Sequence, residues 1–271
     1  MRGKARLMSD RFADLRVQQQ DTSPFLLLGG QVGVLLLHGF SGTPREMRPL
    51  GEYLRSAGLS AYAPLLPGHG GTLDEINRAS WRLWASYASD ALQELGRECD
   101  TLFVAGFSMG SLLALWLAEQ PETSRRLSGV LLYSPALRLA NRKIWLTPLA
   151  RYFVASLPKD EESDLHDSSA EAWLGGFAAY PVPAAAELWQ LNRAVRRKLS
   201  HVQLPCFVAY ASGDKSIHPT SGPETVRWLS QQTQVETLVL HNSGHAVVVD
   251  AEWKLLAKAS LEFIRSLTAP Q

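Results

Sequence analysis

Residues 102–116 read LFVAGFSMGSLLALW: an apolar run typical of a buried strand, a turn with Ser108 at its apex, and an apolar run typical of a helix. Gly106 and Gly110 flank the serine in the pattern G-x-S-x-G of a nucleophile elbow, in which a strained turn exposes a serine hydroxyl. The small residues are needed because the strand and helix backbones approach closely at such a turn. The pentapeptide alone occurs by chance in roughly one chain in ten of this length. The strand before it and the helix after it are therefore the stronger evidence.

The composition is that of a globular α/β protein. The chain has 271 residues, of which 46% are hydrophobic, a length that is normal for one α/β domain carrying an insertion. Lysine and arginine number 27 against 26 aspartates and glutamates, so we expect no general attraction to nucleic acid or to an anionic membrane. We expect a monomer or a weak homo-oligomer that acts on a small molecule.

The N-terminus and the two cysteines predict a cytoplasmic location. Residues 1–20 are mixed and charged, without the apolar core of a signal peptide, and no apolar run is long enough to span a bilayer. Cys99 and Cys206 lie far apart at the edges of predicted strands, which favours free, buried thiols over a disulfide or a metal site. Residues 1–22 match no motif and are interpreted as an N-terminal extension.

Apolar runs alternate with helical patterns along most of the chain, which predicts a mostly parallel sheet with helices on both faces. Residues 24–30 leave room for an early strand. The clearest strands are Val32–Leu37, Ser60–Ala63, Leu102–Ala105, Val130–Tyr133, Cys206–Tyr210 and Val235–Leu240.

Four helix boundaries are readable from the sequence. Residues 43–46, TPRE, combine a capping box with proline at the first helical position. Ser80 is expected to cap the next long helix, and Pro121 to end the helix that follows Ser108. Asp250 is expected to cap a last helix that runs towards Leu267.

The segment 138–200 interrupts the alternation. It has no strong strand pattern, and it combines three tryptophans with a cluster of acidic residues between 160 and 167. Because a structureless loop of this length is unusual in a compact domain, we interpret the segment as a helical cap or lid insertion over the sheet edge. The alternative is an elaborate crossover with solvated acidic turns. The α/β core would then comprise residues 23–137 and 201–271.

A serine nucleophile needs a base within hydrogen-bond reach and an acid that orients the base. Both must lie at the carboxyl ends of strands, in the chain order serine, acid, histidine. Asp214 satisfies these conditions, because it follows a predicted strand that ends near Tyr210. We assign the other downstream aspartates to the insertion, away from the sheet edge, or to the cap of the last helix: Asp160, Asp164, Asp167 and Asp250.

His245 is the predicted base. It lies in a short loop after the last predicted strand, and the preceding Ser243 and Gly244 give the backbone room to turn back towards Ser108. His241 follows the same strand directly and is the nearest competitor. The remaining downstream histidines are interpreted as ordinary surface or core residues: His166, His201 and His218.

An oxyanion hole requires two backbone N–H donors. Met109 follows the nucleophile at the start of a helix, where free N–H groups and the helix dipole favour negative charge. Phe40, in the loop HGFSG after an early strand, is the expected second donor, and His38 is expected to fix that loop by hydrogen bonds.

Together these motifs resemble the α/β-hydrolases of the carboxylesterase and monoacylglycerol lipase type. The matching pieces are LLLHGFSG (35–42), PGHG (67–70), GFSMG (106–110), SGDKSIHP (212–219) and NSGHAVVVD (242–250). The resemblance implies Ser108 as nucleophile, Asp214 as acid and His245 as base, with Phe40 and Met109 at the oxyanion hole. The cap segment matches such enzymes only loosely.

The predicted function is hydrolysis of carboxylic esters, namely short to medium acyl esters or monoacylglycerols, through an acyl-enzyme. Thioesterase, lactonase and carbon–carbon bond hydrolase chemistry use the same triad and remain alternatives, as does a receptor that binds without turnover. No cofactor is needed, and no metal-binding motif is present. Three aromatic residues of the insertion are candidates for the wall of an acyl pocket: Trp145, Trp173 and Phe177.

Overall fold

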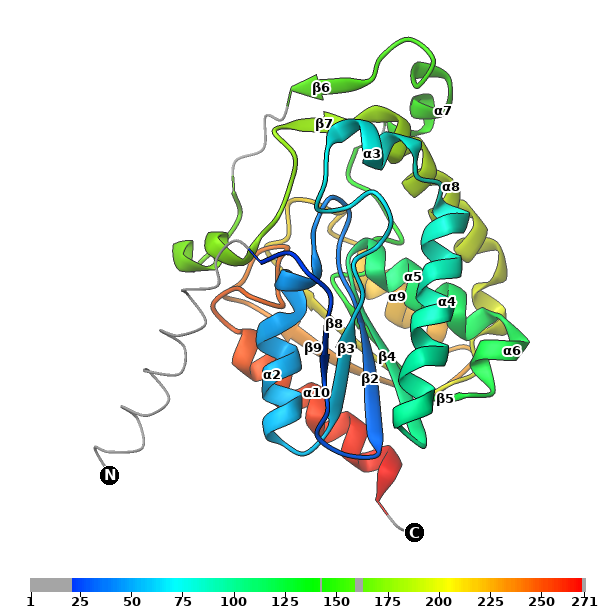
Figure 1. The fold of residues 1–271 in the computed structure, drawn as a ribbon, viewed down its shortest axis with the longest axis vertical. Coiled ribbons are helices and arrows are strands. Elements are labelled where there is room, and N and C mark those ends of the chain that lie inside the picture. The colour runs from blue at the N-terminus through cyan, green and yellow to red at the C-terminus, as the bar shows by residue number, and fades with distance from the viewer. Residues whose placement is uncertain (1–20, 142, 159–162, 270–271) are drawn as a thin grey trace.

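The computed structural model describes residues 21–141, 143–158 and 163–269. Its centre is a seven-stranded sheet with the order β1-β3-β2-β4-β5-β8-β9 (Figure 1). β1 pairs with β3 in antiparallel fashion, and the other neighbours are parallel. The strands are β1 (Phe25–Leu27), β2 (Val32–Leu37), β3 (Ser60–Ala63), β4 (Thr101–Phe107), β5 (Leu127–Tyr133), β8 (Cys206–Ala211) and β9 (Val235–Leu240).

Helices cover both faces of the sheet, as Figure 1 shows. α2 (Arg48–Ser56) and α10 (Trp253–Thr268) pack on one face, and the other face carries α4 (Trp81–Glu98), α5 (Met109–Glu119), α8 (Val182–Lys198) and α9 (Ser221–Leu229). Along β4, Leu102 and Val104 join the second set of helices, whereas Phe103 and Ala105 join the first. Both faces of the strand are buried, which explains its uninterrupted apolar sequence.

The predicted strands all form, and β2, β3 and β9 have the predicted bounds. Ser80 caps α4, because its hydroxyl accepts a hydrogen bond from the Leu83 N–H at 3.2 Å. α5 ends at Glu119, just before α6 (Pro121–Ser124), as the proline predicts.

The capping box predicted at residues 43–46 is wrong. Pro44 does begin a helical turn, the 3-10 turn η1 (Pro44–Met47), but the Thr43 side chain makes no capping hydrogen bond. The Glu46 carboxylate instead accepts the Gly39 N–H at 3.2 Å, so it holds the loop after β2. The structure has a capping box at Thr72 and Glu75, which begins α3 (Leu73–Arg78).

The segment between β5 and β8 is mostly helical but contains a pair of short strands. β6 (Ser156–Pro158) and β7 (Ala179–Pro181) form a two-stranded antiparallel sheet. The sequence does not predict this pair, because each strand has three residues and becomes visible only through its partner. The remaining elements are η2 (Ile144–Leu146), α7 (Thr147–Ala150), η3 (Ser168–Trp173), α8 and η4 (Leu199–His201).

α8 belongs structurally to the core as well as to this segment. Its buried face, which includes Leu188, Leu191 and Val195, joins the same apolar cluster as α4 and α5. The limits 138–200 for a cap insertion therefore remain a prediction. Most of the predicted N-terminal extension, residues 1–20, lies outside the described residues.

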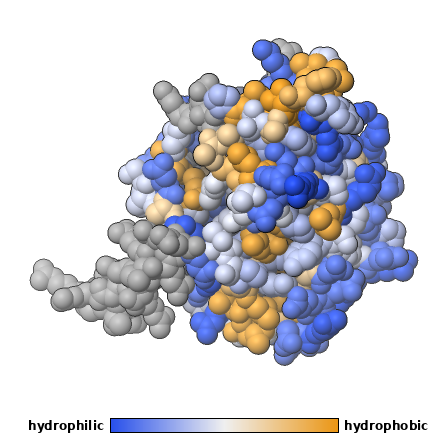
Figure 2. Space-filling model, turned by 45° about the horizontal axis from the view of Figure 1, so that its top comes forward, coloured by the Kyte–Doolittle hydropathy of each residue, from blue (hydrophilic) through white to orange (hydrophobic). Residues whose placement is uncertain are grey.

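The insertion presents apolar side chains to solvent. Leu149 is 67% exposed and Phe153 81% exposed. In Figure 2 apolar surface runs along the top of the molecule, where Figure 1 places β6, β7 and α7. No helix within the described ranges is long and apolar enough to cross a bilayer.

Candidate active site

Ser108 occupies the turn between β4 and α5. Its backbone has φ 53° and ψ −111°, a conformation that side-chain-bearing residues rarely adopt. The Ser108 N–H donates to the carbonyl oxygen of Tyr133 at 2.9 Å, which fixes the turn against the end of β5. The strained turn predicted from G-x-S-x-G is thus present.

The flanking glycines are required by backbone contacts. A Cβ on Gly106 would lie 2.1 Å from the Gly110 carbonyl oxygen, and a Cβ on Gly110 would lie 2.1 Å from the Leu37 carbonyl oxygen. Three backbones therefore meet here: the end of β2, the end of β4 and the start of α5. Ser111 strengthens the junction, because its hydroxyl donates to the Gly106 carbonyl oxygen at 2.6 Å.

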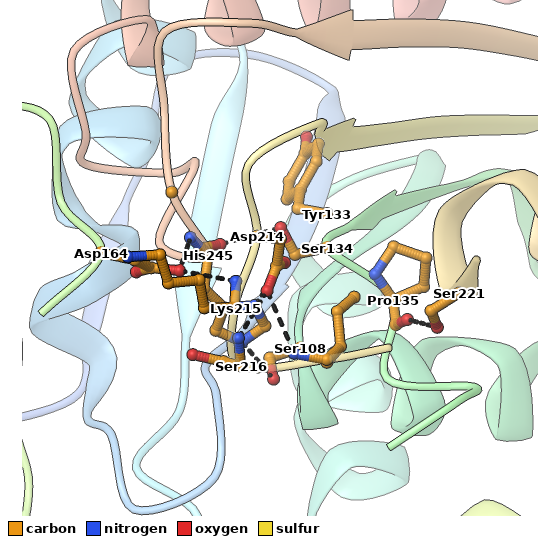
Figure 3. Close-up of polar contacts among 12 residues, drawn as sticks. Ser108, Tyr133, Ser134, Pro135, Asp164, Asp214, Lys215, Ser216, Ser221 and His245 are labelled. Carbon is orange, nitrogen blue, oxygen red and sulfur yellow. Dashed lines mark hydrogen bonds and ion pairs between the residues drawn. The ribbon is translucent and has the colours of Figure 1, made fainter. Parts of the chain in front are cut away.

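The structure brings Ser108, His245 and Asp214 into one chain of contacts (Figure 3). His245 Nε2 lies 2.9 Å from Ser108 Oγ, and His245 Nδ1 lies 2.7 Å from Asp214 Oδ2. The other carboxylate oxygen of Asp214 accepts the N–H groups of Ser216 at 2.9 Å and Ile217 at 3.1 Å. These bonds hold the acid in place.

The contacts define the state of the imidazole. An ionised Asp214 only accepts hydrogen bonds, so His245 Nδ1 carries the proton and Nε2 presents a lone pair to the Ser108 hydroxyl. Burial lowers the pKa of His245, but the hydrogen bond and charge of Asp214, with the charges of Asp164 and Glu46, outweigh burial and raise it above its usual value. This arrangement can accept the serine proton and stabilise the resulting imidazolium.

The two other histidines considered at this edge have different roles. His241 Nδ1 lies 3.3 Å from Ser212 Oγ in an exposed position. His38 is fully buried: its Nε2 accepts the Leu66 N–H at 3.2 Å, and its Nδ1 lies 3.0 Å from the Gly39 carbonyl oxygen. Burial lowers the pKa of His38 well below its usual value, so a neutral ring fixes the loop after β2.

Phe40 and Met109 lie on adjacent backbones. The start of α5 touches the end of β2 at Gly110, and Phe40 is in the loop that leaves β2. Neither the Phe40 N–H nor the Met109 N–H donates to another residue of the described part of the chain. Met109 lies at the N-terminus of α5, where the helix dipole favours negative charge, and the role of the two N–H groups in an oxyanion hole remains a prediction.

Comparison with known proteins identifies the family. The model of the alpha/beta hydrolase family matches residues 34–259. This chain belongs to the alpha/beta hydrolase family. The matched region contains the elbow, Asp214 and His245. The predicted α/β-hydrolase fold is therefore confirmed.

The relatives of this alpha/beta hydrolase include named ester hydrolases. A thermostable monoacylglycerol lipase of Bacillus sp. (strain H-257) is 30% identical over 243 residues, covering 89% of this chain and 93% of the lipase. A carboxylesterase of Bacillus subtilis (strain 168) is 25% identical over 252 residues, which cover 90% of this chain and 96% of the carboxylesterase. A solved structure reported with LipS and LipT, two metagenome-derived lipolytic enzymes, has a TM-score of 0.82 and 29% identity, covering 90% of this chain and 98% of that chain. The resemblance inferred from the motifs is confirmed.

The structure corrects the assignment of Asp250 to a helix cap. α10 begins at Trp253 with Glu252 at its N-cap position. The fully buried carboxylate of Asp250 instead accepts N–H groups of Gly244 at 2.7 Å, Asp167 at 2.8 Å and His166 at 3.0 Å. It therefore joins the histidine loop to the insertion.

Asp164 was assigned to a position away from the sheet edge, and this is also wrong. Its Oδ2 accepts the N–H groups of Lys215 and His245, each at 3.0 Å. Asp160 lies outside the described residues. The sequence feature that relates to this position of Asp164 is Gly244, the residue before His245. Because Gly244 has no side chain, it leaves space for Asp164.

Ser134 is a further supporting residue that the sequence analysis missed. It follows β5 with φ 43°, and its hydroxyl donates to the His245 carbonyl oxygen at 2.8 Å. The side chain thus fixes the backbone of the base from the side of β5.

The three aromatic candidates for substrate contact are not gathered in one cluster. Trp145 is 61% exposed. Trp173 packs against the apolar cluster that contains Phe107, and Phe177 packs against the cluster on the other face of the sheet. Their role in substrate binding remains a prediction.

The cysteines and the other metal-binding residue types form no second site in the described residues. Cys99 and Cys206 are free and buried. Burial raises the pKa of the Cys99 thiol, and it raises the pKa of the Cys206 thiol to about 12. Such thiols are unreactive at neutral pH. Across the described ranges, no group of three or more histidines, cysteines or acids is arranged to hold a metal.

Proposed function

We propose that this alpha/beta hydrolase cleaves carboxylic esters through an acyl-enzyme on Ser108. The observation that carries the proposal is the contact chain from Ser108 Oγ through His245 to Asp214, at a strained elbow. Relatives named as monoacylglycerol lipase and carboxylesterase support ester substrates.

In this reaction His245 Nε2 takes the hydroxyl proton as Ser108 Oγ attacks the ester carbonyl carbon. Asp214 holds the ring and stabilises the imidazolium. The N–H groups of Phe40 and Met109 donate to the carbonyl oxygen as it becomes negatively charged. His245 then gives its proton to the leaving alcohol, and a water molecule, activated in the same way, hydrolyses the acyl-enzyme.

The substrate class follows from the insertion. It exposes large apolar side chains, Leu149 and Phe153 among them, and the whole chain has a formal net charge of only +1. An uncharged ester with a short to medium acyl chain, or a monoacylglycerol, suits such a surface better than a highly charged substrate.

Hydrolysis of p-nitrophenyl esters of increasing acyl length tests the proposal, with monoacylglycerols and acyl thioesters assayed beside them. Sustained turnover that Ser108→Ala abolishes is expected. Stoichiometric release without turnover, or unchanged activity of Ser108→Ala, would reject it. A preference for thioesters would move the substrate class to the thioesterases while keeping the triad.

We also propose a cytoplasmic location, supported by the two free, buried thiols. Cell fractionation followed by immunodetection tests it. Recovery from a membrane or secreted fraction would contradict it.

A further inference from the structure

Asp164 joins the loops of the acid and the base. It lies in the stretch between β6 and η3, far from both loops in the sequence. Its Oδ2 accepts the N–H of Lys215, the residue after Asp214, and the N–H of His245 itself, each at 3.0 Å (Figure 3). One carboxylate oxygen therefore ties the backbone of the base, His245, to the backbone of the residue next to the acid, Asp214.

Gly244 independently indicates that the chain is built to receive Asp164. A Cβ at Gly244 would lie 2.1 Å from the Asp164 carbonyl oxygen and 2.7 Å from Asp164 Cγ. The glycine does not need a positive φ. Its requirement is space, and the residue that fills this space is Asp164.

The residues after Asp164 are anchored to the same histidine loop. Asp250 accepts the N–H groups of His166 and Asp167, and His166 Nδ1 lies 3.0 Å from Asn242 Oδ1. The position of Asp164 is thus imposed by several contacts with the β9–α10 connection rather than by one.

The charge of Asp164 also acts on the imidazole. Three acidic groups influence His245: Asp214 on the loop after β8, Asp164 on the insertion and Glu46 on η1. Burial opposes protonation of His245, and these charges favour it. A negative charge held at the backbone of the base therefore stabilises the imidazolium that forms when the serine attacks.

We propose that Asp164 is a positioning residue that aligns His245 with Asp214 and, through its charge, favours the protonated base in the transition state. This inference rests on the proposed ester hydrolysis. It places part of the catalytic support in the insertion.

Two substitutions separate alignment from charge. Asp164→Asn keeps the volume and an accepting oxygen but removes the charge, and Asp164→Ala removes both. Glu171→Gln removes an exposed carboxylate from the same segment and is the matched control. Because charge-assisted hydrogen bonds are about twice as strong as neutral ones, we expect kcat to fall roughly 5- to 10-fold in Asp164→Asn and further in Asp164→Ala. KM should change little.

The pH profile distinguishes a positioning role from a merely structural one. Loss of the Asp164 charge lowers the pKa of His245, so the acid limb of the kcat/KM profile should move to lower pH in Asp164→Asn and stay in place in Glu171→Gln. The rate of fluorophosphonate labelling at Ser108 provides a second, substrate-independent readout of the same protonation.

The outcomes separate this inference from the proposed function. If Ser108→Ala abolishes turnover but Asp164→Asn leaves the acid limb and the labelling profile unchanged, the inference is overturned and the esterase proposal stands. If Ser108→Ala retains turnover, the proposed function fails first. A loss in Asp164→Asn no larger than that in Glu171→Gln also overturns the inference.

Discussion

Backbone strain at Ser108 makes an unusual stability prediction: glycine should be more stable than alanine at this position. Ser108 has φ 53° and ψ −111°, which alanine tolerates as poorly as serine and glycine adopts freely. Both Ser108→Gly and Ser108→Ala remove the hydroxyl that contacts His245. The comparison of the two variants therefore cancels the lost hydrogen bond and isolates the backbone conformation.

The expected difference follows from three terms. Strain at such a position costs about 1–3 kcal/mol, which glycine relieves. Glycine loses about 0.5–1 kcal/mol because its unfolded chain has more freedom, and it gives up part of the roughly 0.8 kcal/mol from burying a methyl group. The free energy of unfolding of Ser108→Gly should therefore exceed that of Ser108→Ala by about 1 kcal/mol. For a chain of this size that corresponds to a Tm about 2 °C higher than that of Ser108→Ala.

Thermal and chemical unfolding of both variants measures the difference, and an ester assay checks that both are inactive. Ser86 supplies the control, because it is exposed within α4. There the order must reverse, with Ser86→Gly about 1 kcal/mol less stable than Ser86→Ala. If alanine is the more stable residue at both positions, the elbow carries no strain and this reasoning is refuted.

Three further predictions concern the site and the core. His245→Ala should reduce ester turnover by several orders of magnitude while His241→Ala costs little; equal losses would refute the choice of base. Gly110→Ala should lower the Tm and the turnover together, because its Cβ would lie 2.1 Å from a backbone oxygen of β2; a wild-type Tm would contradict the close approach. Burial raises the pKa of Glu119 to about 8, and neither carboxylate oxygen has a hydrogen-bond partner among the described residues. The folded chain thus holds a proton that the unfolded chain releases, and stability should fall as pH rises from about 4.5 to 8. Glu119→Gln should flatten this dependence in Tm measurements, and an unchanged slope would assign it to other groups.

The sequence predicts those parts of the fold that depend on local chemistry. β2, β3 and β9 are continuous apolar or alternating runs between turn residues, and their bounds agree with the structure. The sequence also predicts that Ser108, Asp214 and His245 meet, because each follows a strand that ends at the same edge of the sheet, and their side chains are in contact in the structure. The parallel order of the strands converts these separate positions into one site.

Two of the failed predictions share a physical cause: a side chain was assigned to its nearest backbone partner when a more distant one competes for it. Glu46 was expected to complete a local capping box, but it accepts the Gly39 N–H. Asp250 was expected to cap α10, but it accepts N–H groups from the insertion and the histidine loop. Local pattern does not reveal such contacts, because the first depends on the loop after β2 and the second on the path of residues 163–167.

That path changes what the insertion means for the chemistry. If the insertion only covered the sheet, the substrate pocket and the triad could vary independently. Instead, Asp164 accepts the backbone N–H of the base, and Asp250 accepts N–H groups from residues 166 and 167 as well as Gly244. Residues 163–167 therefore belong physically to the active-site edge. The part of the insertion that can change with the substrate without disturbing these contacts must therefore lie outside residues 163–167. That part includes η2, α7 and the β6–β7 pair.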